Sequence, residues 1–477
     1  MACRHLISFK GTITPLIRLH AAPDYMREPA VKKTLYWCSR CNLPLVGRTC
    51  RCGATGAQIT LQKPYDVRPA LAHDMEVLRS LLMERYGTDR LPQIVLFNKI
   101  GGVDRTENII ANGVLFGRLA YNPPTASYSL DLTLDALTTL LPSITRGIVE
   151  IDAPDDRRRI GGKKLAVSTD LSDGPVVVRM GDLHGTGTLR DGAVRVRQVG
   201  AVTPRTLPDP PWGEAIRVNV PALKNMERTA VRFIRQHMHD RPRANISFSG
   251  GKDSTVVWEL ARRAGIKEAY FVNTGMEFPE TVEFVKECGI ETHLRAGDFW
   301  HDVKKYGLPR KDDRWCCERL KLTPVKEWCE REGACVTVQG NRWYESFVRS
   351  TLPPVVENPF NPLQLNISPI RNWRALEVFL YIWWRKVPCN PLYEMGFERV
   401  GCWNCPAMLG SEEARTREIH PDLAARWEHY LGEWARKERV SDRFIELGLW
   451  RWKELPPKMR ELAAQEGISI PKKRRSG

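Results

Sequence analysis

One stretch of the chain constrains its local structure most strongly, the residues from Ile246 to Val257, which read ISFSGGKDSTVV. The apolar run before Ser249 is typical of a buried strand. The adjacent glycines Gly250 and Gly251 permit the backbone dihedrals of a sharp turn. The helix that follows offers unpaired N–H groups and a positive dipole end. The segment therefore predicts a strand, a turn and a helix that together bind an anion.

The side chains of this segment indicate that the anion is a phosphate group. Lys252 supplies a positive charge that can stabilise a transition state, and Asp253 supplies a carboxylate suited to Mg²⁺. The spacing differs from the GxxxxGK[ST] pattern of the common P-loop. We expect the nucleotide cradle to comprise Ser247, Ser249, Gly250, Gly251, Lys252, Asp253 and Ser254.

Apolar strands, glycine turns and helices alternate from about residue 243 to 340, which predicts βαβ units with a parallel sheet and helices on both faces. Ligands of such sheets lie beyond the carboxyl ends of the strands. Thr274, Gly275, Gly340 and Arg342 follow apolar runs, so we expect them in the same cleft. Arg342 and Arg349 can clamp a phosphate or sulfate bidentately, and surface ion pairs are the alternative for both.

The SGGKDS string resembles the pyrophosphate (PP) loop of the ATP pyrophosphatase and phosphoadenosine phosphosulfate (PAPS) reductase superfamily. Four later blocks extend this resemblance over roughly residues 221–408: residues 271–281, 340–349, 369–373 and 390–397. Family members often carry Asp where Asn273 stands. The resemblance implies an α/β catalytic domain of the adenine nucleotide alpha hydrolase type, with a parallel sheet and a bound adenine nucleotide.

Four cysteines of this region can supply the thiolates that an iron–sulfur cluster requires: the pair Cys316 and Cys317, and the CxxC of Cys402 and Cys405. The pattern is similar to the cluster-bearing branch of the adenylylsulfate reductases, which implies a [4Fe–4S] centre beside the nucleotide. A structural zinc site is the alternative.

A second cysteine set lies near the N-terminus, as two short knuckles in a small polar segment. Such knuckles are typical of a tetrahedral zinc ribbon, in which the metal supplies folding energy that the small core cannot. A redox or cluster role is the alternative. The predicted Zn²⁺ ligands are Cys38, Cys41, Cys50 and Cys52.

The length of 477 residues exceeds what one core organises, so we expect several domains. Short strands and glycine turns over 146–202 predict a small β-barrel, and this segment resembles the RNA-binding PUA domain. The whole arrangement resembles archaeal-type family members. The predicted segments are a zinc ribbon with its flanks (1–65), an α/β region (66–145), the PUA-like barrel (146–202), a proline-rich linker (203–219), the PP-loop domain (220–410) and a helical extension with a basic tail (411–477).

The composition favours an anionic partner, because 72 Lys and Arg against 56 Asp and Glu give a net charge of +16. No apolar run approaches the length of a membrane span, and the first ten residues lack the pattern of a signal peptide. Clustered metal-type cysteines then favour the reducing cytoplasm. The sequence does not indicate an oligomeric state.

Two reactions compete for the predicted cleft. Reduction of an adenylyl sulfate to sulfite uses, in the family, a mobile C-terminal cysteine and a thiol reductant, and no cysteine follows Cys405 here. The favoured reading is ATP-dependent modification of RNA, most plausibly tRNA. ATP adenylates a base carbonyl oxygen, and a sulfur donor then replaces it. A non-catalytic RNA-binding protein is the third alternative.

Overall fold

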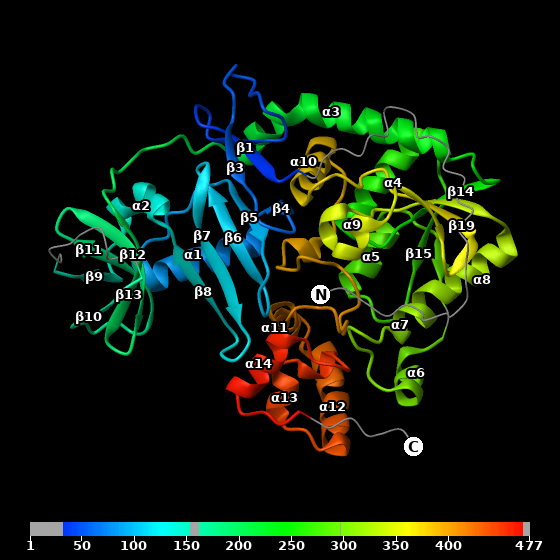
Figure 1. Cartoon of the computed structure of the whole chain (residues 1–477). Coiled ribbons are helices and arrows are strands. Elements are labelled where there is room, and N and C mark those ends of the chain that lie inside the picture. Colours follow the sequence, from blue (N-terminus) through cyan, green and yellow to red (C-terminus); the bar gives the residue numbers. More distant parts are fainter. Residues whose placement is uncertain (1–31, 153–161, 296, 471–477) are drawn as a thin grey trace, which may run out of the picture.

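The computed structural model describes residues 32–152, 162–295 and 297–470. It places a catalytic α/β unit beside an N-terminal half built from three small sheets, with a group of helices from the end of the chain below both (Figure 1). No helix of the described residues is long and apolar enough to cross a membrane. The basic tail and the N-terminal segment examined for a signal peptide lie outside the described residues.

The catalytic unit contains a six-stranded sheet in the order β16-β15-β14-β17-β19-β18. All neighbouring strands are parallel except β18, which pairs antiparallel with β19. This confirms the predicted α/β fold with a parallel sheet. The strands are β14 (Arg243–Ser247), β15 (Ala269–Val272), β16 (Thr292–Leu294), β17 (Cys335–Val338), β18 (Val355–Asn358) and β19 (Asn361–Ile367).

Helices connect and flank these strands (Figure 1). They are α3 (Trp212–His237), α4 (Lys252–Ala264), α5 (Pro279–Glu287), α6 (Phe299–Tyr306), α7 (Trp315–Cys317), α8 (Thr323–Glu332), α9 (Phe347–Thr351) and α10 (Ala375–Arg385). Helix α3 begins inside the segment predicted as a linker. Pro211 is its N-cap residue, where its lack of an N–H costs no helical hydrogen bond, and Pro221 lies within the helix.

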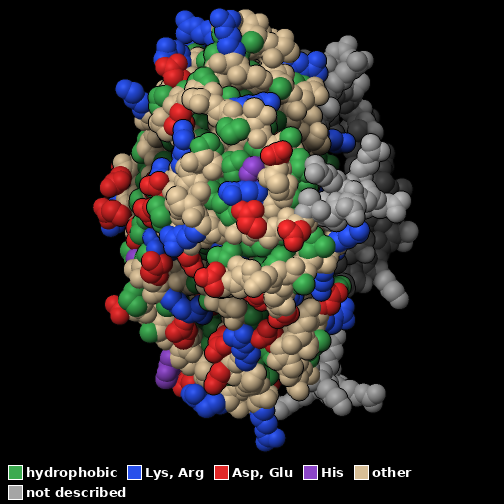
Figure 2. Space-filling view, turned by 90° about the vertical axis from the view of Figure 1, so that its left-hand side faces the viewer, with side chains coloured by type: hydrophobic (Ala, Val, Ile, Leu, Met, Phe, Trp, Pro, Cys, Tyr) green, Lys and Arg blue, Asp and Glu red, His purple; other side chains and the backbone are tan. Residues whose placement is uncertain are grey.

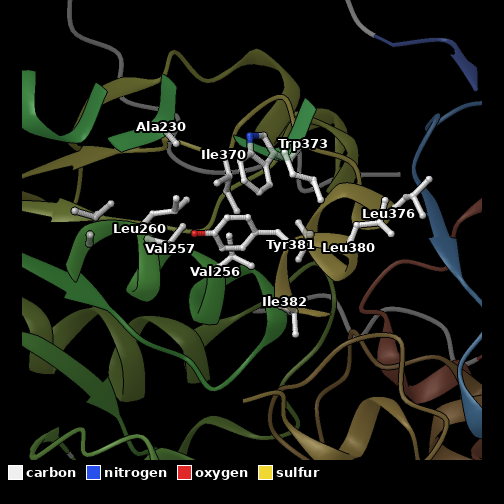
Figure 3. Close-up of a cluster of buried hydrophobic side chains, with 14 of the residues drawn as sticks. Ala230, Val256, Val257, Leu260, Ile370, Trp373, Leu376, Leu380, Tyr381 and Ile382 are labelled. Carbon is white, nitrogen blue, oxygen red and sulfur yellow. The ribbon is translucent and has the colours of Figure 1, made fainter. Parts of the chain in front are cut away.

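Helix α10 ties the main core together. Its residues from Ala375 to Ile382 are all buried, and the one charged side chain among them, Glu377, pairs with Arg374. Figure 3 shows Tyr381 beside Val256 and Val257 of α4. The Tyr381 hydroxyl donates to Glu227 Oε2 at 2.8 Å, so its buried polar group is satisfied. The helix also packs against α3 and against β4 of the N-terminal half.

The N-terminal half begins with two antiparallel sheets. The first has the order β2-β1-β3 and the second β4-β5-β6-β7-β8, with α1 and α2 packed on the second. The elements are β1 (Thr34–Cys38), β2 (Leu43–Leu45), β3 (Ala57–Thr60), β4 (Val67–Pro69), α1 (Ala72–Tyr86), β5 (Val95–Lys99), β6 (Thr106–Ala111), β7 (Val114–Asn122), β8 (Ser127–Leu132) and α2 (Leu134–Leu140).

The segment predicted as a PUA-like barrel forms a five-stranded sheet in the order β10-β13-β12-β11-β9. Among the described residues its two outer strands do not pair, so the strand ladder is open, and seven buried residues from Val149 to Val196 form its small core. Basic and acidic side chains are interspersed on the face in Figure 2. The PUA assignment remains a prediction. The strands are β9 (Ile148–Glu150), β10 (Lys164–Ala166), β11 (Gly174–Met180), β12 (Leu183–Arg190) and β13 (Ala193–Gly200).

The chain continues into α11 (Gly410–Ile419), α12 (Pro421–Glu438), α13 (Asp442–Glu446) and α14 (Pro457–Gln465). Trp427 and Trp450 of this region are buried in a core shared with Phe299. The Asp104 carboxylate, from the N-terminal half, accepts hydrogen bonds from the N–H groups of Gly410 and Ser411 at 2.6 and 3.1 Å. The start of α11 is therefore capped from the other half of the chain.

Candidate active site

The candidate site lies where the strand order changes direction, between β14 and β17. Both strands end at the same edge of the parallel sheet, and ligands of open α/β sheets bind at this point. Gly340, just after β17, approaches the first turn of α4 very closely. A Cβ atom there would stand 2.7 Å from the carbonyl carbon of Asp253. Only glycine permits this contact, which explains the residue type at the end of the strand.

The loop between β14 and α4 has the predicted form of a phosphate cradle. Gly250 has a φ of +73°, a conformation that favours glycine. Ser254 Oγ accepts from the Ser249 N–H at 3.1 Å and donates to the Gly251 carbonyl at 2.8 Å, which braces the turn. The Lys252 N–H donates to the Tyr393 hydroxyl at 2.9 Å. The loop is thus held from within and from a later segment.

The two charged side chains of the loop are tied to a buried arginine. Lys252 Nζ lies 2.9 Å from Asp253 Oδ2, and Arg342 Nε lies 2.7 Å from Asp253 Oδ1. The second contact is an ion pair whose angle does not make a hydrogen bond. Both carboxylate oxygens therefore face cations, and Mg²⁺ at Asp253 would have to replace one of them.

Arg342 is only 2% exposed and has a second carboxylate partner in the N-terminal half. Its two terminal nitrogens donate to Asp66 Oδ1 and Oδ2, each at 3.1 Å. Burial alone would lower the pKa of Arg342, but Asp253 and Asp66 hold it well above its ordinary value. Arg349 pairs with Glu345. The two predicted clamp residues are thus engaged in ion pairs, and their role in anion binding remains a prediction.

The turn after β15 connects the nucleotide side of the cleft with the cysteines. Glu277 accepts from both the N–H and the hydroxyl of Thr274 at 2.9 Å. Thr274 Oγ1 lies 3.5 Å from Cys402 Sγ, and Glu277 forms a backbone bridge with Cys402. Asn273 accepts from the Gly275 N–H at 2.9 Å, so here it shapes the turn.

The four cysteines predicted to hold the cluster, Cys316, Cys317, Cys402 and Cys405, line the same cleft. A hydrogen bond between Cys316 and Cys317 raises the pKa of Cys316 and lowers that of Cys317. Burial raises the pKa of Cys402 to about 11. Deprotonation of Cys316 and Cys402 is therefore favoured by a nearby positive charge.

Two cations face these sulfur atoms. Arg314 donates to Cys317 Sγ at 3.1 Å. The pKa of Lys321 is raised, chiefly by Cys402, although burial opposes this. Within the described ranges, only the N-terminal set brings its sulfur atoms within 4.8 Å of one another. Four thiolates are the donor set that an iron–sulfur cluster requires, and the assignment of this set to such a cluster remains a prediction.

The cleft has a volume of about 1340 Å³ and three walls. The phosphate loop and the segment around Arg342 form one wall, and the cysteines form another. The N-terminal half contributes Lys63, Tyr65 and Lys99 to the third. Residues predicted for this cleft that do line it are Ser247, Ser249, Gly251, Lys252, Asp253, Ser254, Thr274, Gly340, Arg342, Arg349, Cys316, Cys317, Cys402 and Cys405. Gly250 and Gly275 were predicted for the same cleft and are not in its lining.

Several residues of the site were not predicted. Asn390 donates to the Gly250 carbonyl at 3.2 Å and Tyr393 accepts from the loop. Both belong to the block at residues 390–397, so that block was the available signal. Glu277 lies in the block at residues 271–281, which was likewise its signal. Asp66 carries no comparable motif, because an isolated acidic residue does not reveal its distant partner.

The N-terminal cysteines are brought together as predicted. Cys38 Sγ lies 3.6 Å from Cys52 Sγ, and Cys41 Sγ lies 3.9 Å from Cys50 Sγ. The Cys41 N–H donates to Cys38 Sγ at 3.4 Å. All four sulfur atoms lie within 4.8 Å of one another, so this set could hold a metal ion.

Comparison with known proteins agrees with this geometry. Residues 243–408 match the phosphoadenosine phosphosulfate reductase domain. The chain is also 32% identical to the uncharacterized protein MJ0066 of Methanocaldococcus jannaschii, over 88% of this chain and 96% of that protein. This chain belongs to the PAPS reductase family.

Several other relatives cover a smaller part of this chain. The adenosine 5'-phosphosulfate reductase of Deinococcus radiodurans is 28% identical over 42% of this chain and 72% of its own length. A crystal structure of the PAPS reductase from Candida auris covers 38% of this chain and 94% of that one, with 19% identity and a TM-score of 0.32. The family relationship supports an enzymatic activity that involves a nucleotide.

Proposed function

We propose that this protein is an adenylating enzyme that inserts sulfur into RNA, with tRNA as the most plausible substrate. In this reaction a base carbonyl oxygen attacks the α-phosphorus of ATP, and pyrophosphate leaves. A sulfur nucleophile then displaces AMP from the activated base. The products are a thiolated base, AMP and pyrophosphate.

The observation that carries the proposal is the composition of one cleft. It brings a phosphate loop and four cysteines together with a wall from the N-terminal half. Its volume of about 1340 Å³ exceeds the roughly 300–1,000 Å³ typical of a small-molecule site. A nucleotide alone would leave much of this space empty, and a second, larger substrate would account for it.

Different groups of the loop have different roles in adenylation. Backbone N–H groups at the start of α4 bind the departing phosphates, and Lys252 neutralises their developing charge. Asp253 fixes the position of Lys252 through the contact at 2.9 Å. Mg²⁺, which prefers oxygen ligands, would be held mainly by the phosphates and water, since Asp253 already faces two cations.

The cysteine wall fits a [4Fe–4S] cluster by its donor set and by the two cations, Arg314 and Lys321, that offset thiolate charge. Bound there, such a cluster would supply soft metal ions that hold sulfur close to the activated base. At the N-terminus, four tightly grouped cysteines fit a tetrahedral Zn²⁺ site.

The alternative is reduction of an adenylyl sulfate, which the named reductase relatives favour. That reaction needs a nucleophilic cysteine besides the cluster ligands. Cys329 and Cys335 do not fit this role, because Cys335 opens β17 opposite Arg243, at the sheet edge away from the cleft, and both cysteines are fully buried. Among the described residues that line the cleft, the cysteines are the four predicted ligands.

RNA binding is assigned to the N-terminal half and rests on the excess of basic residues and on Lys63 and Tyr65 in the cleft wall. A non-catalytic RNA-binding protein would need neither the braced phosphate loop nor the cysteine wall. Charge reversal at Lys63 should weaken RNA binding and flatten its salt dependence.

One experiment separates the two reactions. Anaerobically reconstituted protein is incubated with ATP and bulk tRNA, and in parallel with adenylyl sulfates and a thiol reductant. The proposal expects pyrophosphate and thiolated nucleosides in the first reaction. Sulfite from the second, without thiolated nucleosides in the first, would establish the reductase instead.

Asp253→Ala tests the role of the loop. Loss of this carboxylate frees Lys252 and Arg342, so pyrophosphate release should fall below detection while RNA affinity stays close to that of the wild type. Unchanged turnover would reject the adenylation mechanism.

A further inference from the structure

The loop that precedes β4 reaches from the N-terminal half into the catalytic centre. Lys63, Pro64, Tyr65 and Asp66 all line the cleft, and Tyr65 has a φ of +66°, which is uncommon for a residue with a side chain. Backbone conformations of this kind persist where surrounding structure enforces them, and they are frequent at functional sites. The loop is therefore expected to be held in this conformation by the contacts that its residues make.

Asp66 makes three hydrogen bonds across the interface between the halves. Its two oxygens accept from the terminal nitrogens of Arg342, each at 3.1 Å. Oδ1 also accepts from the N–H of Ala375, at the start of α10, at 2.7 Å. The carboxylate is therefore fixed both by the guanidinium and by a helix N-terminus that the catalytic unit supplies.

This arrangement occupies the nitrogens with which Arg342 could bind a phosphate and leaves its Nε facing the phosphate loop. The edge that carries both terminal nitrogens is the edge that would grip a phosphate bidentately, and Asp66 occupies it. The remaining nitrogen, Nε, lies 2.7 Å from Asp253 in the phosphate loop. A chain of ion pairs thus runs from the N-terminal half through Arg342 to the loop carboxylate.

We propose that Asp66 is a positioning residue that the N-terminal half supplies to the catalytic centre. It holds the Arg342 guanidinium against Asp253 and away from the bound phosphates. Asp253, in turn, keeps Lys252 oriented toward the leaving group. The inference rests on the proposed function only for its turnover assay.

The test compares Asp66→Asn with Asp74→Asn. Asp74 is the control, because it is an aspartate of the N-terminal half that, like Asp66, accepts from arginine and from a backbone N–H, but no hydrogen bond or ion pair links it to the phosphate loop. Thermal denaturation reports the folding of each variant, and titration with inorganic pyrophosphate reports the state of Arg342.

The two readouts should move in opposite directions for Asp66→Asn. Turnover should fall on the order of 10- to 100-fold, as is usual when a supporting residue is lost. Pyrophosphate should bind about tenfold more tightly, because the freed guanidinium edge can grip it. Asp74→Asn should lower the melting temperature without changing either value for the folded protein.

Weaker pyrophosphate binding together with lower turnover, or the same behaviour as Asp74→Asn, would overturn the inference. If Asp66→Asn does not fold, Asp66→Glu keeps the charge and should show wild-type pyrophosphate affinity with reduced turnover; wild-type turnover would overturn it. If the wild type releases no pyrophosphate with RNA, the proposed function fails, and tighter pyrophosphate binding by Asp66→Asn still supports the role of Asp66.

Discussion

At the residue scale, the phosphate site depends on two glycines, whose lack of a side chain matters as much as the functional groups of their neighbours. Gly340 lets the end of β17 contact the backbone of Asp253, and Gly250 lets the loop turn with a positive φ. Neither residue offers a functional group. Each one sets how closely two elements approach and so fixes where the N–H groups of α4 point.

Gly340→Ala should therefore disturb the phosphate loop, because the new side chain would press on the first turn of α4. The new Cβ would stand 2.7 Å from a backbone carbon that cannot move freely, which should cost about 1–3 kcal/mol of stability and weaken nucleotide binding. Gly213→Ala is the control, because a Cβ there meets nothing within 4 Å. Chemical denaturation and ATP titration measure both effects, and equal behaviour of the two variants would contradict the packing argument.

At the element scale, the cysteine wall is assembled from two separate segments, α7 and the turn at Cys402 to Cys405. A backbone bridge between Glu277 and Cys402 joins this turn to the end of β15. Cys402 is thus held beside the loop that follows β15, through Glu277 and Thr274.

Cys402→Ser should abolish the broad brown absorbance of anaerobically purified protein and remove its iron, because one of four thiolates is lost. Cys288→Ser changes a cysteine outside the cleft lining and should keep both. Absorption spectra and metal analysis provide the measurement. A colourless wild type with stoichiometric zinc at this site would contradict the cluster.

A chelator that removes metal from the N-terminal cysteines should change the local stability of the chain and not its colour. Removal of zinc should increase amide hydrogen exchange over residues 34–60, because the metal would link the two cysteine knuckles of this small sheet, although Leu35, Trp37 and Leu43 also pack in the main core. The effect should extend to α3, where Asn219 accepts from the Val46 N–H at 2.7 Å. Unchanged exchange after complete loss of zinc would show that the sheet folds without metal.

Sequence patterns predicted the elements of the catalytic unit well, because a strand, a glycine turn and a helix leave a local signature. The Asp66–Arg342 pair left none, since its partners stand 276 residues apart. The predicted role of Arg342 in binding a phosphate stays untested, and its partly buried partner Asp66 was not predicted. The start of α3 was placed too late because prolines that precede a helix resemble those of a linker.

At the scale of the whole molecule, buried charges hold the two halves together beside the cleft. Glu398, near the CxxC turn, lies 2.9 Å from Lys99 and 3.0 Å from Arg105. Burial by itself raises the pKa of Glu398, but Lys99 and Arg105 lower it to about 2. The ionised form is thus favoured by the folded state.

This pairing predicts a definite pH dependence. Because the folded pKa is depressed, the stability from Glu398 is present above its ordinary pKa of 4.5 and is lost as the pH falls toward about 2. Glu398→Gln should cost about 3–5 kcal/mol at pH 7 and should reduce the loss of stability on acidification. Denaturant unfolding between pH 7 and pH 3 measures this.

Glu283→Gln is the control for that prediction, because Glu283 forms an exposed ion pair with Lys286. Its unfolding free energy should stay close to that of the wild type at every pH. Identical profiles for the two variants would show that Glu398 does not join the halves.

The cap that Asp104 places on α11 has a consequence for protein engineering. If the PP-loop unit were fused to an unrelated N-terminal half, the N–H groups of Gly410 and Ser411 would lose their acceptor, Asp104. The start of α11 would then lose this cap even though every predicted catalytic side chain was retained. A successful fusion must therefore place a carboxylate of its own at the start of α11. The choice of the N-terminal half is constrained by the geometry of these hydrogen bonds as well as by the length of the connection.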